Sequence, residues 1–140
     1  MDKILHVVDV PASPEKVFAA ATTEEGLSSW WTTKVRARPE VGSVIEFTFV
    51  PDVFNPRMRV DELTEPTTVA WSCVGGHEPW ADAGIRFDIR EHEGGSRLTF
   101  RQEYTAGDEE SFGIYNFNWG YYLESLRKYC QTGTGTPFPA

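Results

Sequence analysis

Apolar and polar side chains alternate with a period of two through most of the middle of the chain, between residues 43 and 104. In the segment 43–50, Ile45 and Phe47 fall on one side and Glu46 falls on the other. This period is that of a β-strand with one buried face. The pattern predicts strands at residues 43–50, 57–63, 68–74, 83–91 and 97–104, preceded by a short strand at 34–37.

The N-terminal part of the chain predicts one further strand and two short helices. Residues 4–10 are rich in branched apolar side chains and stop before a proline, as a first strand would. Ser13 followed by proline predicts an N-cap and the first position of a helix over residues 14–21. A second short helix, capped by Thr22 or Thr23, then ends on two consecutive tryptophans.

In the C-terminal part, the spacing of apolar residues changes to three and four. This spacing predicts a helix over residues 111–131, with an acidic run before it and Gly133 after it as a stop. One side of this helix carries Phe112, Tyr115, Trp119, Tyr122, Leu126 and Tyr129. Most of these side chains are Trp or Tyr, which carry a polar atom that a purely structural core does not need.

The predicted strands have one apolar face and one charged face, which is typical of an antiparallel sheet covered on one side. Only the C-terminal helix is long enough to cover that side. The sequence therefore predicts an α+β fold. A curved seven-stranded antiparallel sheet wraps around a long C-terminal helix, two short helices follow the first strand, and residues 1–140 form a single domain. A curved sheet and a straight helix touch along only part of their length, so we expect a cavity between them.

Composition limits the partners and the compartment. The net charge of -8 and the absence of any cluster of Lys and Arg argue against nucleic acid and against a membrane surface as partners. Cys73 and Cys130 lie far apart; we favour reduced core thiols, although a lone disulfide stays open. With no signal-like segment and no apolar run long enough to cross a bilayer, we expect a cytoplasmic protein.

Residues 10–31 (Val-Pro-Ala-Ser-Pro-Glu-Lys-Val-Phe-Ala-Ala-Ala-Thr-Thr-Glu-Glu-Gly-Leu-Ser-Ser-Trp-Trp) resemble the opening of the SRPBCC superfamily. Its START-like, helix-grip proteins include polyketide cyclases and aromatases. The chain is most similar to the family named after the activator of the Hsp90 ATPase, because residues 97–100 resemble its late strand and residues 119–129 its closing helix. The resemblance implies a sheet that grips the last helix around a hydrophobic cavity. Many relatives carry His where this chain has Gln102, which disfavours proton transfer at that position.

The expected cavity is the first candidate site. Strand parity and the helix stripe predict that its walls are Phe47, Phe49, Met58, Val60, Trp71, Phe87, Ile89, Phe100, Gln102, Tyr104, Tyr115, Trp119, Tyr122 and Leu123. Any one of these side chains, taken alone, is better explained as ordinary core. The set is harder to explain that way, because several buried polar atoms would need partners, at about 1–3 kcal/mol each if unmet. A small ligand, or ordered water in a cavity, would supply such partners.

Two tryptophans are candidates for the cavity entrance. Trp80 stands on a Gly-rich loop, where a large aromatic side chain is either an anchor or a lid. Trp31 adjoins a second tryptophan, so on a regular element the two side chains point to different sides, one into the core and one toward the cavity mouth.

Metal binding and nucleophilic catalysis find little support in the sequence. His6, His77 and His92 lie on a strand, a loop and a hairpin, without the short spacings that metal ligands share. No Ser sits on a Gly-flanked elbow. For acid–base chemistry, the inward positions offer only His6, Glu62, Glu91 and the tyrosine hydroxyls. We expect no metal and no cofactor.

Three functions follow from the pattern and the resemblance together, in order of preference. The first is non-catalytic binding of a small hydrophobic or aromatic molecule in the internal cavity. The second is a cofactor-independent enzyme similar to a polyketide cyclase or aromatase, as the resemblance implies. The third is an interaction module like a chaperone activator. A homodimer is compatible with all three.

Overall fold

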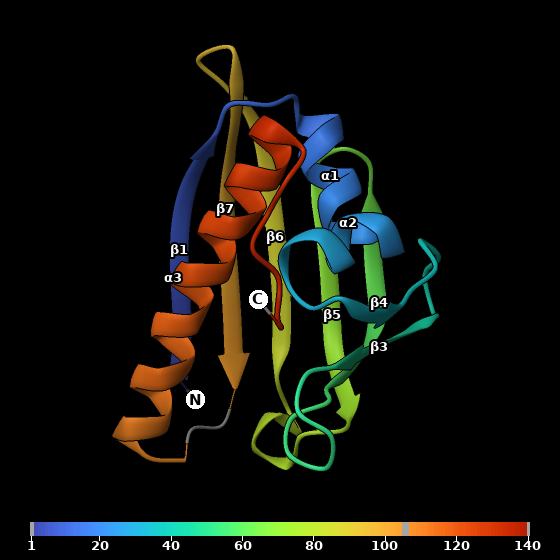
Figure 1. Ribbon diagram of the computed structural model, residues 1–140, viewed down its shortest axis with the longest axis vertical. Coiled ribbons are helices and arrows are strands. Elements are labelled where there is room, and N and C mark those ends of the chain that lie inside the picture. The colour runs from blue at the N-terminus through green and yellow to red at the C-terminus, as the bar shows by residue number, and fades with distance from the viewer. Residues whose placement is uncertain (1, 105–106, 140) are drawn as a thin grey trace.

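The computed structural model describes residues 2–104 and 107–139, which form one curved antiparallel sheet and three α-helices. The elements are β1 (Asp2–Val10), α1 (Pro14–Thr22), α2 (Glu24–Trp30), β2 (Lys34–Arg36), β3 (Val44–Thr48), β4 (Arg57–Thr64), β5 (Thr68–Gly75), the 3-10 helix η1 (Glu78–Trp80), β6 (Gly84–His92), β7 (Gly95–Tyr104) and α3 (Glu109–Thr132). The strand order is β1-β7-β6-β5-β4-β3-β2. Figure 1 shows α3 lying obliquely across one face of the sheet, with α1 and α2 beside it. The predicted fold class is confirmed.

Local capping signals fix where the helices begin and end. The side chain of Ser13 accepts a hydrogen bond from the Lys16 backbone N–H (3.3 Å), and Thr23 is the cap of α2. Helix α3 begins at Glu109, two residues earlier than predicted, because Asp108 is its N-cap and accepts from the Ser111 N–H (2.7 Å). It ends at Thr132, and Gly133 after it, with a φ of 88°, stops the helix as expected.

One strand departs from simple alternation. The register between β4 and β5 shifts between Val60 and Glu62, so an extra residue is inserted in β4 at that point. The shift moves Glu62 to the charged outer face, where its carboxylate lies 3.6 Å from the Arg86 guanidinium. The expectation that Glu62 faces inward was therefore wrong, because a bulge reverses the parity of every later residue.

The interior is packed with large aromatic side chains. Trp30, Trp71, Phe47, Phe87 and Phe100 are all fully buried between the sheet and the helices. Their rings contact one another at centroid distances of about 5–6.5 Å, the usual range for aromatic pairs. The space between the middle of the sheet and the helices is therefore filled by packed side chains.

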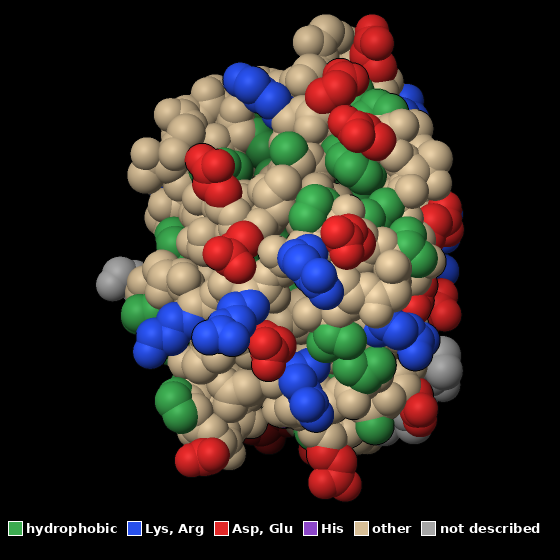
Figure 2. Space-filling view, turned by 90° about the vertical axis from the view of Figure 1, so that its right-hand side faces the viewer, with side chains coloured by type: hydrophobic (Ala, Val, Ile, Leu, Met, Phe, Trp, Pro, Cys, Tyr) green, Lys and Arg blue, Asp and Glu red, His purple; other side chains and the backbone are tan. Residues whose placement is uncertain are grey.

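The outer face of the sheet is mainly polar, as predicted, although Leu5 and Val7 of β1 are exposed on it. Asp88 accepts hydrogen bonds from both Arg86 and Arg101, and Arg97 binds the Asp9 carboxylate through two nitrogens (2.7 and 3.0 Å). On the side of the molecule that carries β2 and β3, acidic and basic side chains are interspersed with small apolar areas (Figure 2). Across the described part of the chain, none of the helices is long and apolar enough to cross a membrane.

The C-terminal segment folds back along the molecule, as Figure 1 shows between α3 and α2. Phe138 pairs with the chain after α2 through two backbone hydrogen bonds: its N–H donates to Trp31 O (2.9 Å), and its carbonyl accepts from Thr33 N–H (2.8 Å). The Ser125 hydroxyl receives the Thr136 N–H (2.7 Å) and donates to Trp30 O (2.8 Å). The tail is therefore part of the fold.

Candidate functional site

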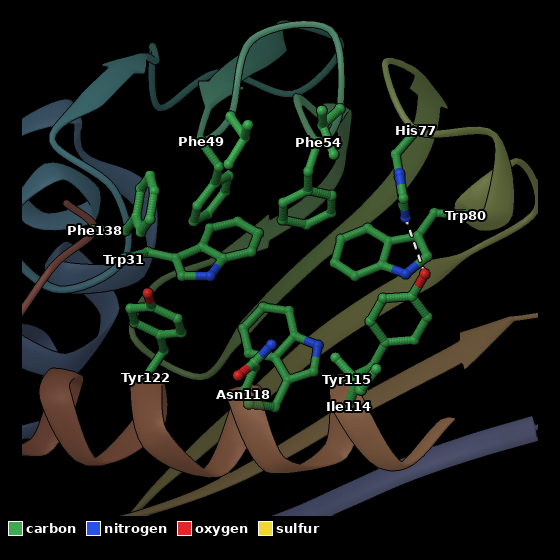
Figure 3. A pocket seen from close by; sticks show the side chains of 13 residues that line it. Trp31, Phe49, Phe54, His77, Trp80, Ile114, Tyr115, Asn118, Tyr122 and Phe138 are labelled. Carbon is green, nitrogen blue, oxygen red and sulfur yellow. Dashed lines mark hydrogen bonds between the residues drawn. The ribbon is translucent and has the colours of Figure 1, made fainter. Parts of the chain in front are cut away.

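A groove of about 430 Å³ lies at one end of the sheet, between the first half of α3 and the loops that follow β3 and β5. Figure 3 shows side chains from α3, from both loops and from the C-terminal segment converging on it. We call it the aromatic groove. It is lined by Trp31, Phe49, Val50, Val53, Phe54, His77, Trp80, Ile114, Tyr115, Asn118, Trp119, Tyr122 and Phe138.

The loop after β3 supplies one wall of the groove, and Asn55 holds its shape. The Asn55 side chain accepts from the Phe49 N–H (3.2 Å) and donates to Val50 O (3.0 Å). This short closure bends the chain back so that Phe49 and Phe54 lie ring to ring at 4.8 Å. Val53 stays 66% exposed and forms part of the rim.

The loop after β5 supplies the facing wall, and it packs directly on the first loop. Gly76 has a φ of 86°, and a Cβ there would lie 1.8 Å from the Asn55 carbonyl oxygen. Only glycine permits this approach. The loop then turns through η1, which buries Trp80 against Phe54 (5.1 Å) and Tyr115 (5.6 Å).

Three tryptophans form the floor of the groove. Trp119 of α3 stacks with Trp31 at 4.9 Å and with Trp80 at 6.3 Å. All three are at most 3% exposed, so the groove ends on their edges and faces. We expected Trp31 and Trp80 at the entrance; the structure places both in the floor, because the loops fold over their rings.

Two polar side chains of the groove pair with each other. His77 Nε2 lies 3.0 Å from the Tyr115 hydroxyl. Burial lowers the pKa of His77, opposed only in part by a backbone hydrogen bond with Val53. Burial also raises the pKa values of Tyr115 and Tyr122. At neutral pH these groups are therefore uncharged.

One buried donor in the floor is unmatched. Among the described residues, Trp80 Nε1 has no hydrogen-bond partner, although Trp80 is only 2% exposed. A buried N–H without a partner costs about 1–3 kcal/mol. An acceptor atom on a molecule in the groove would relieve that cost.

Of the predicted wall residues, the structure brings four to the groove: Phe49, Tyr115, Trp119 and Tyr122. The others lie deeper, in the packed core, and do not line it. They are Phe47, Met58, Val60, Trp71, Phe87, Ile89, Phe100, Gln102, Tyr104 and Leu123. The sequence predicted that buried polar side-chain atoms would need hydrogen-bond partners from a ligand. Two of these atoms pair inside the protein, because Trp119 Nε1 donates to Gln102 Oε1 at 2.6 Å.

Sequence reasoning missed seven lining residues: Val50, Val53, Phe54, His77, Ile114, Asn118 and Phe138. Val53 and Phe54 carried a usable signal, since apolar residues in a Pro- and Asn-containing turn have no core to fill locally. Phe138 carried none, because its role depends on the fold-back of the tail.

The remaining titratable groups lie outside the groove. His6 faces inward, as its parity predicted, but it lies under α3 next to Gly120. Glu91 is exposed on β6. No cluster of three or more His, Cys, Asp or Glu side chains that could hold a metal ion occurs among the described residues. Cys73 and Cys130 are free buried thiols.

Comparison with known proteins gives a consistent result. A family model described as Activator of Hsp90 ATPase homolog 1-like protein matches residues 11–131. The solution structure of the Aha1 dimer from Colwellia psychrerythraea is similar, with 31% identity and a TM-score of 0.87 over 96% of this chain and 100% of that one.

Two more distant structures share the fold. An X-ray structure of a Staphylococcus saprophyticus protein has 20% identity and a TM-score of 0.78, over 96% of this chain and 95% of that one. An AHSA1-like protein from Aeromonas hydrophila has 13% identity and a TM-score of 0.72, over 94% of each chain. None of the curated proteins matches the sequence.

Proposed function

The chain belongs to the family of Activator of Hsp90 ATPase homolog 1-like proteins, and from this membership and its groove we propose that it binds one small, uncharged, aromatic or apolar molecule. The aromatic groove carries the proposal. Its volume of about 430 Å³ falls within the range of about 300–1,000 Å³ that is common for small-molecule sites. Aromatic rings from five separate segments line it: the chain after α2, the loops after β3 and β5, α3 and the C-terminal segment. Figure 3 shows them converging.

The charge of the groove supports an uncharged ligand. No Asp, Glu, Lys or Arg occurs among the lining residues. The lowered pKa of His77 and the raised pKa values of Tyr115 and Tyr122 keep the three titratable side chains neutral at pH 7. A charged ligand would lose its hydration without gaining an opposite charge, which is unfavourable.

The polar atoms of the groove support a ligand with one acceptor. Trp80 Nε1 is a buried donor in the floor, without a hydrogen-bond partner among the described residues. The exposed Asn118 amide and the Tyr115 hydroxyl lie at the same wall of the groove (Figure 3). A planar molecule between the rings, with its acceptor toward Trp80, satisfies the aromatic walls and the unmatched donor together.

In this proposal, six of the site residues that the sequence predicted contact the ligand: Trp31, Phe49, Trp80, Tyr115, Trp119 and Tyr122. The deeper residues act indirectly, since they hold the floor in place. Gln102, for example, fixes the Trp119 indole through its side-chain oxygen.

Two fluorescent probes with one skeleton test the proposal. N-phenyl-1-naphthylamine is neutral, and 8-anilino-1-naphthalenesulfonate carries a sulfonate on the same ring system. The neutral probe should bind with one-to-one stoichiometry and at least about tenfold more tightly, a difference of about 1.4 kcal/mol. Equal binding, or tighter binding of the sulfonate, would contradict an uncharged site.

A matched pair of substitutions on α3 locates the binding. Asn118→Trp fills the groove from an exposed position, whereas Asn116→Trp adds the same side chain at an exposed position that does not line it. The first should abolish binding of the neutral probe, and the second should leave it unchanged. If both variants bind alike, the probe occupies another site.

We propose in addition that the chain forms a homodimer. The supporting observation is its likeness to the Colwellia protein, whose solution structure is described as a dimer and which shares 31% identity over nearly the whole length. Sedimentation velocity over a wide concentration range measures this directly. A monomer throughout that range would contradict it.

A further inference from the structure

Strand β1 forms one edge of the sheet and is long, regular and partly apolar. In the described part of the chain it pairs on one side only, with β7, and the register is unbroken over nine residue pairs. Leu5 is 53% exposed and Val7 57% exposed on its outer face. An edge with free backbone groups and exposed apolar side chains is a surface that can add another strand.

We propose that two copies of this chain join along β1, antiparallel, about a two-fold axis at His6, into one continuous sheet. This rests on the homodimer proposed above and names its surface. When two copies of one strand pair antiparallel about a two-fold axis, the numbers of any two facing residues add up to the same value. An axis at His6 therefore sets Leu5 opposite Val7 of the second copy, and Lys3 opposite Asp9.

Charge complementarity selects this register. Within one chain, Lys3 lies beside Glu103 of β7 (4.0 Å), and Asp9 binds Arg97 of β7 (2.7 Å). With the axis at His6, the two ion pairs become part of one row of side chains that crosses four strands. The row consists of Arg97 and Asp9 of one copy, followed by Lys3 and Glu103 of the second copy, so positive and negative charges alternate along it. Opposite charges directly across an antiparallel pair stabilise it, and like charges destabilise it.

Neighbouring registers lack this match. The backbone N–H and C=O groups of β1 point toward the free edge at every second residue. A second β1 strand can therefore change its register only in steps of two residues, and each step moves the two-fold axis by one residue. An axis at Leu5 sets Lys3 opposite Val7, and an axis at Val7 sets Leu5 opposite Asp9. Both put a charge against an apolar side chain, whereas the axis at His6 pairs charge with charge and apolar with apolar.

Helix α3 offers a second contact on the other face of the joined sheet. Figure 1 shows that its N-terminal turns reach past the free edge of β1. In the two-fold pair these turns lie over the β1 strand of the second copy, and the two α3 helices come side by side. Phe117, in that half of the helix, is 75% exposed in the single chain and is placed to be covered.

Val7→Lys tests this surface in the full-length protein. Val7 points outward, so circular dichroism should be unchanged, while sedimentation should show dimerisation weakened at least about tenfold, since symmetry applies the change twice. Val41→Lys, at a loop position 62% exposed, is the matched control and should dimerise as the unaltered chain does. A Val7→Lys protein that dimerises normally would overturn the β1 surface and leave the homodimer standing.

Cysteine pairing tests the register. Under mild oxidation, chains carrying Leu5→Cys should form disulfides with chains carrying Val7→Cys, because facing positions on paired strands lie within disulfide reach. Leu5→Cys mixed with Val41→Cys should not. Cross-linking of Leu5→Cys only with itself would overturn the His6 axis, and a purely monomeric unaltered chain would overturn the homodimer and this surface together.

Discussion

The buried hydrogen bond between Trp119 and Gln102 joins α3 to the sheet beneath the groove, and its removal should be costly. Trp119 is 3% exposed and Gln102 is 0% exposed. In Trp119→Phe, Gln102 Oε1 loses its donor (now at 2.6 Å) and is left buried without a partner, which costs about 1–3 kcal/mol. The smaller ring removes three heavy atoms from a packed interior, for about 2 kcal/mol more. We expect a loss of about 3–5 kcal/mol.

Gln102→Leu should cost much less. It leaves the Trp119 N–H buried without an acceptor. It also removes the Gln102 side-chain nitrogen, which is buried without a partner among the described residues. The two effects offset, so the expected loss is about 0–2 kcal/mol. The double variant contains neither an unpaired Gln102 oxygen nor an unpaired Trp119 N–H. Its loss of stability should therefore be smaller than the sum of the two single losses by about 1–3 kcal/mol.

Urea unfolding followed by circular dichroism at 222 nm measures this coupling without depending on tryptophan emission. The two single variants, the double variant and the unaltered chain form one cycle. Losses that add within about 0.5 kcal/mol would refute the reasoning, because independent sites add and hydrogen-bonded pairs do not.

Three further predictions concern the groove and the thiols. Because burial holds the pKa of His77 below its ordinary 6.5, the unfolded chain takes up that proton first; stability and probe affinity should fall as the pH drops below about 6.5, and His77→Gln should flatten both profiles. Gly76→Ala should cost about 1–3 kcal/mol in urea unfolding and weaken the neutral probe, since the new Cβ meets the Asn55 carbonyl; full stability would refute the loop contact. Burial raises the pKa of Cys130 to about 11 and also raises that of Cys73; both thiols should resist Ellman's reagent at pH 8 until urea is added, and fast reaction in the native protein would contradict their burial.

The sequence predicted the fold well because its signals are local and repeated. Alternation in the strands and the three-and-four spacing of α3 each state which side of an element is buried, and together they leave one arrangement. The β4 bulge escaped prediction, because an inserted residue such as Asp61 looks like any other polar position in an alternating segment. The start of α3 was set two residues late because Asp108 was read as part of an acidic run and not as a cap.

The site was harder to predict because parity identifies the buried face but not where packing stops. Phe87 and Phe100 share a face with Phe49, yet only Phe49 lies at the end of the sheet where the helix and sheet diverge. Phe54 and Phe138 reach the groove through a loop closure and a tail that folds back. Such contacts depend on tertiary structure and leave no periodic pattern.

The location of a bound molecule tests the central claim most directly. Isotope-filtered nuclear Overhauser spectroscopy of the full chain with N-phenyl-1-naphthylamine reports which side chains lie within a few ångströms of the probe. We predict contacts from the probe to the rings of Phe54, Tyr115, Tyr122 and Phe138, which come from three separate segments and meet only in the aromatic groove. Contacts confined to other surfaces, or to the exposed Leu5 and Val7 of β1, would contradict the account.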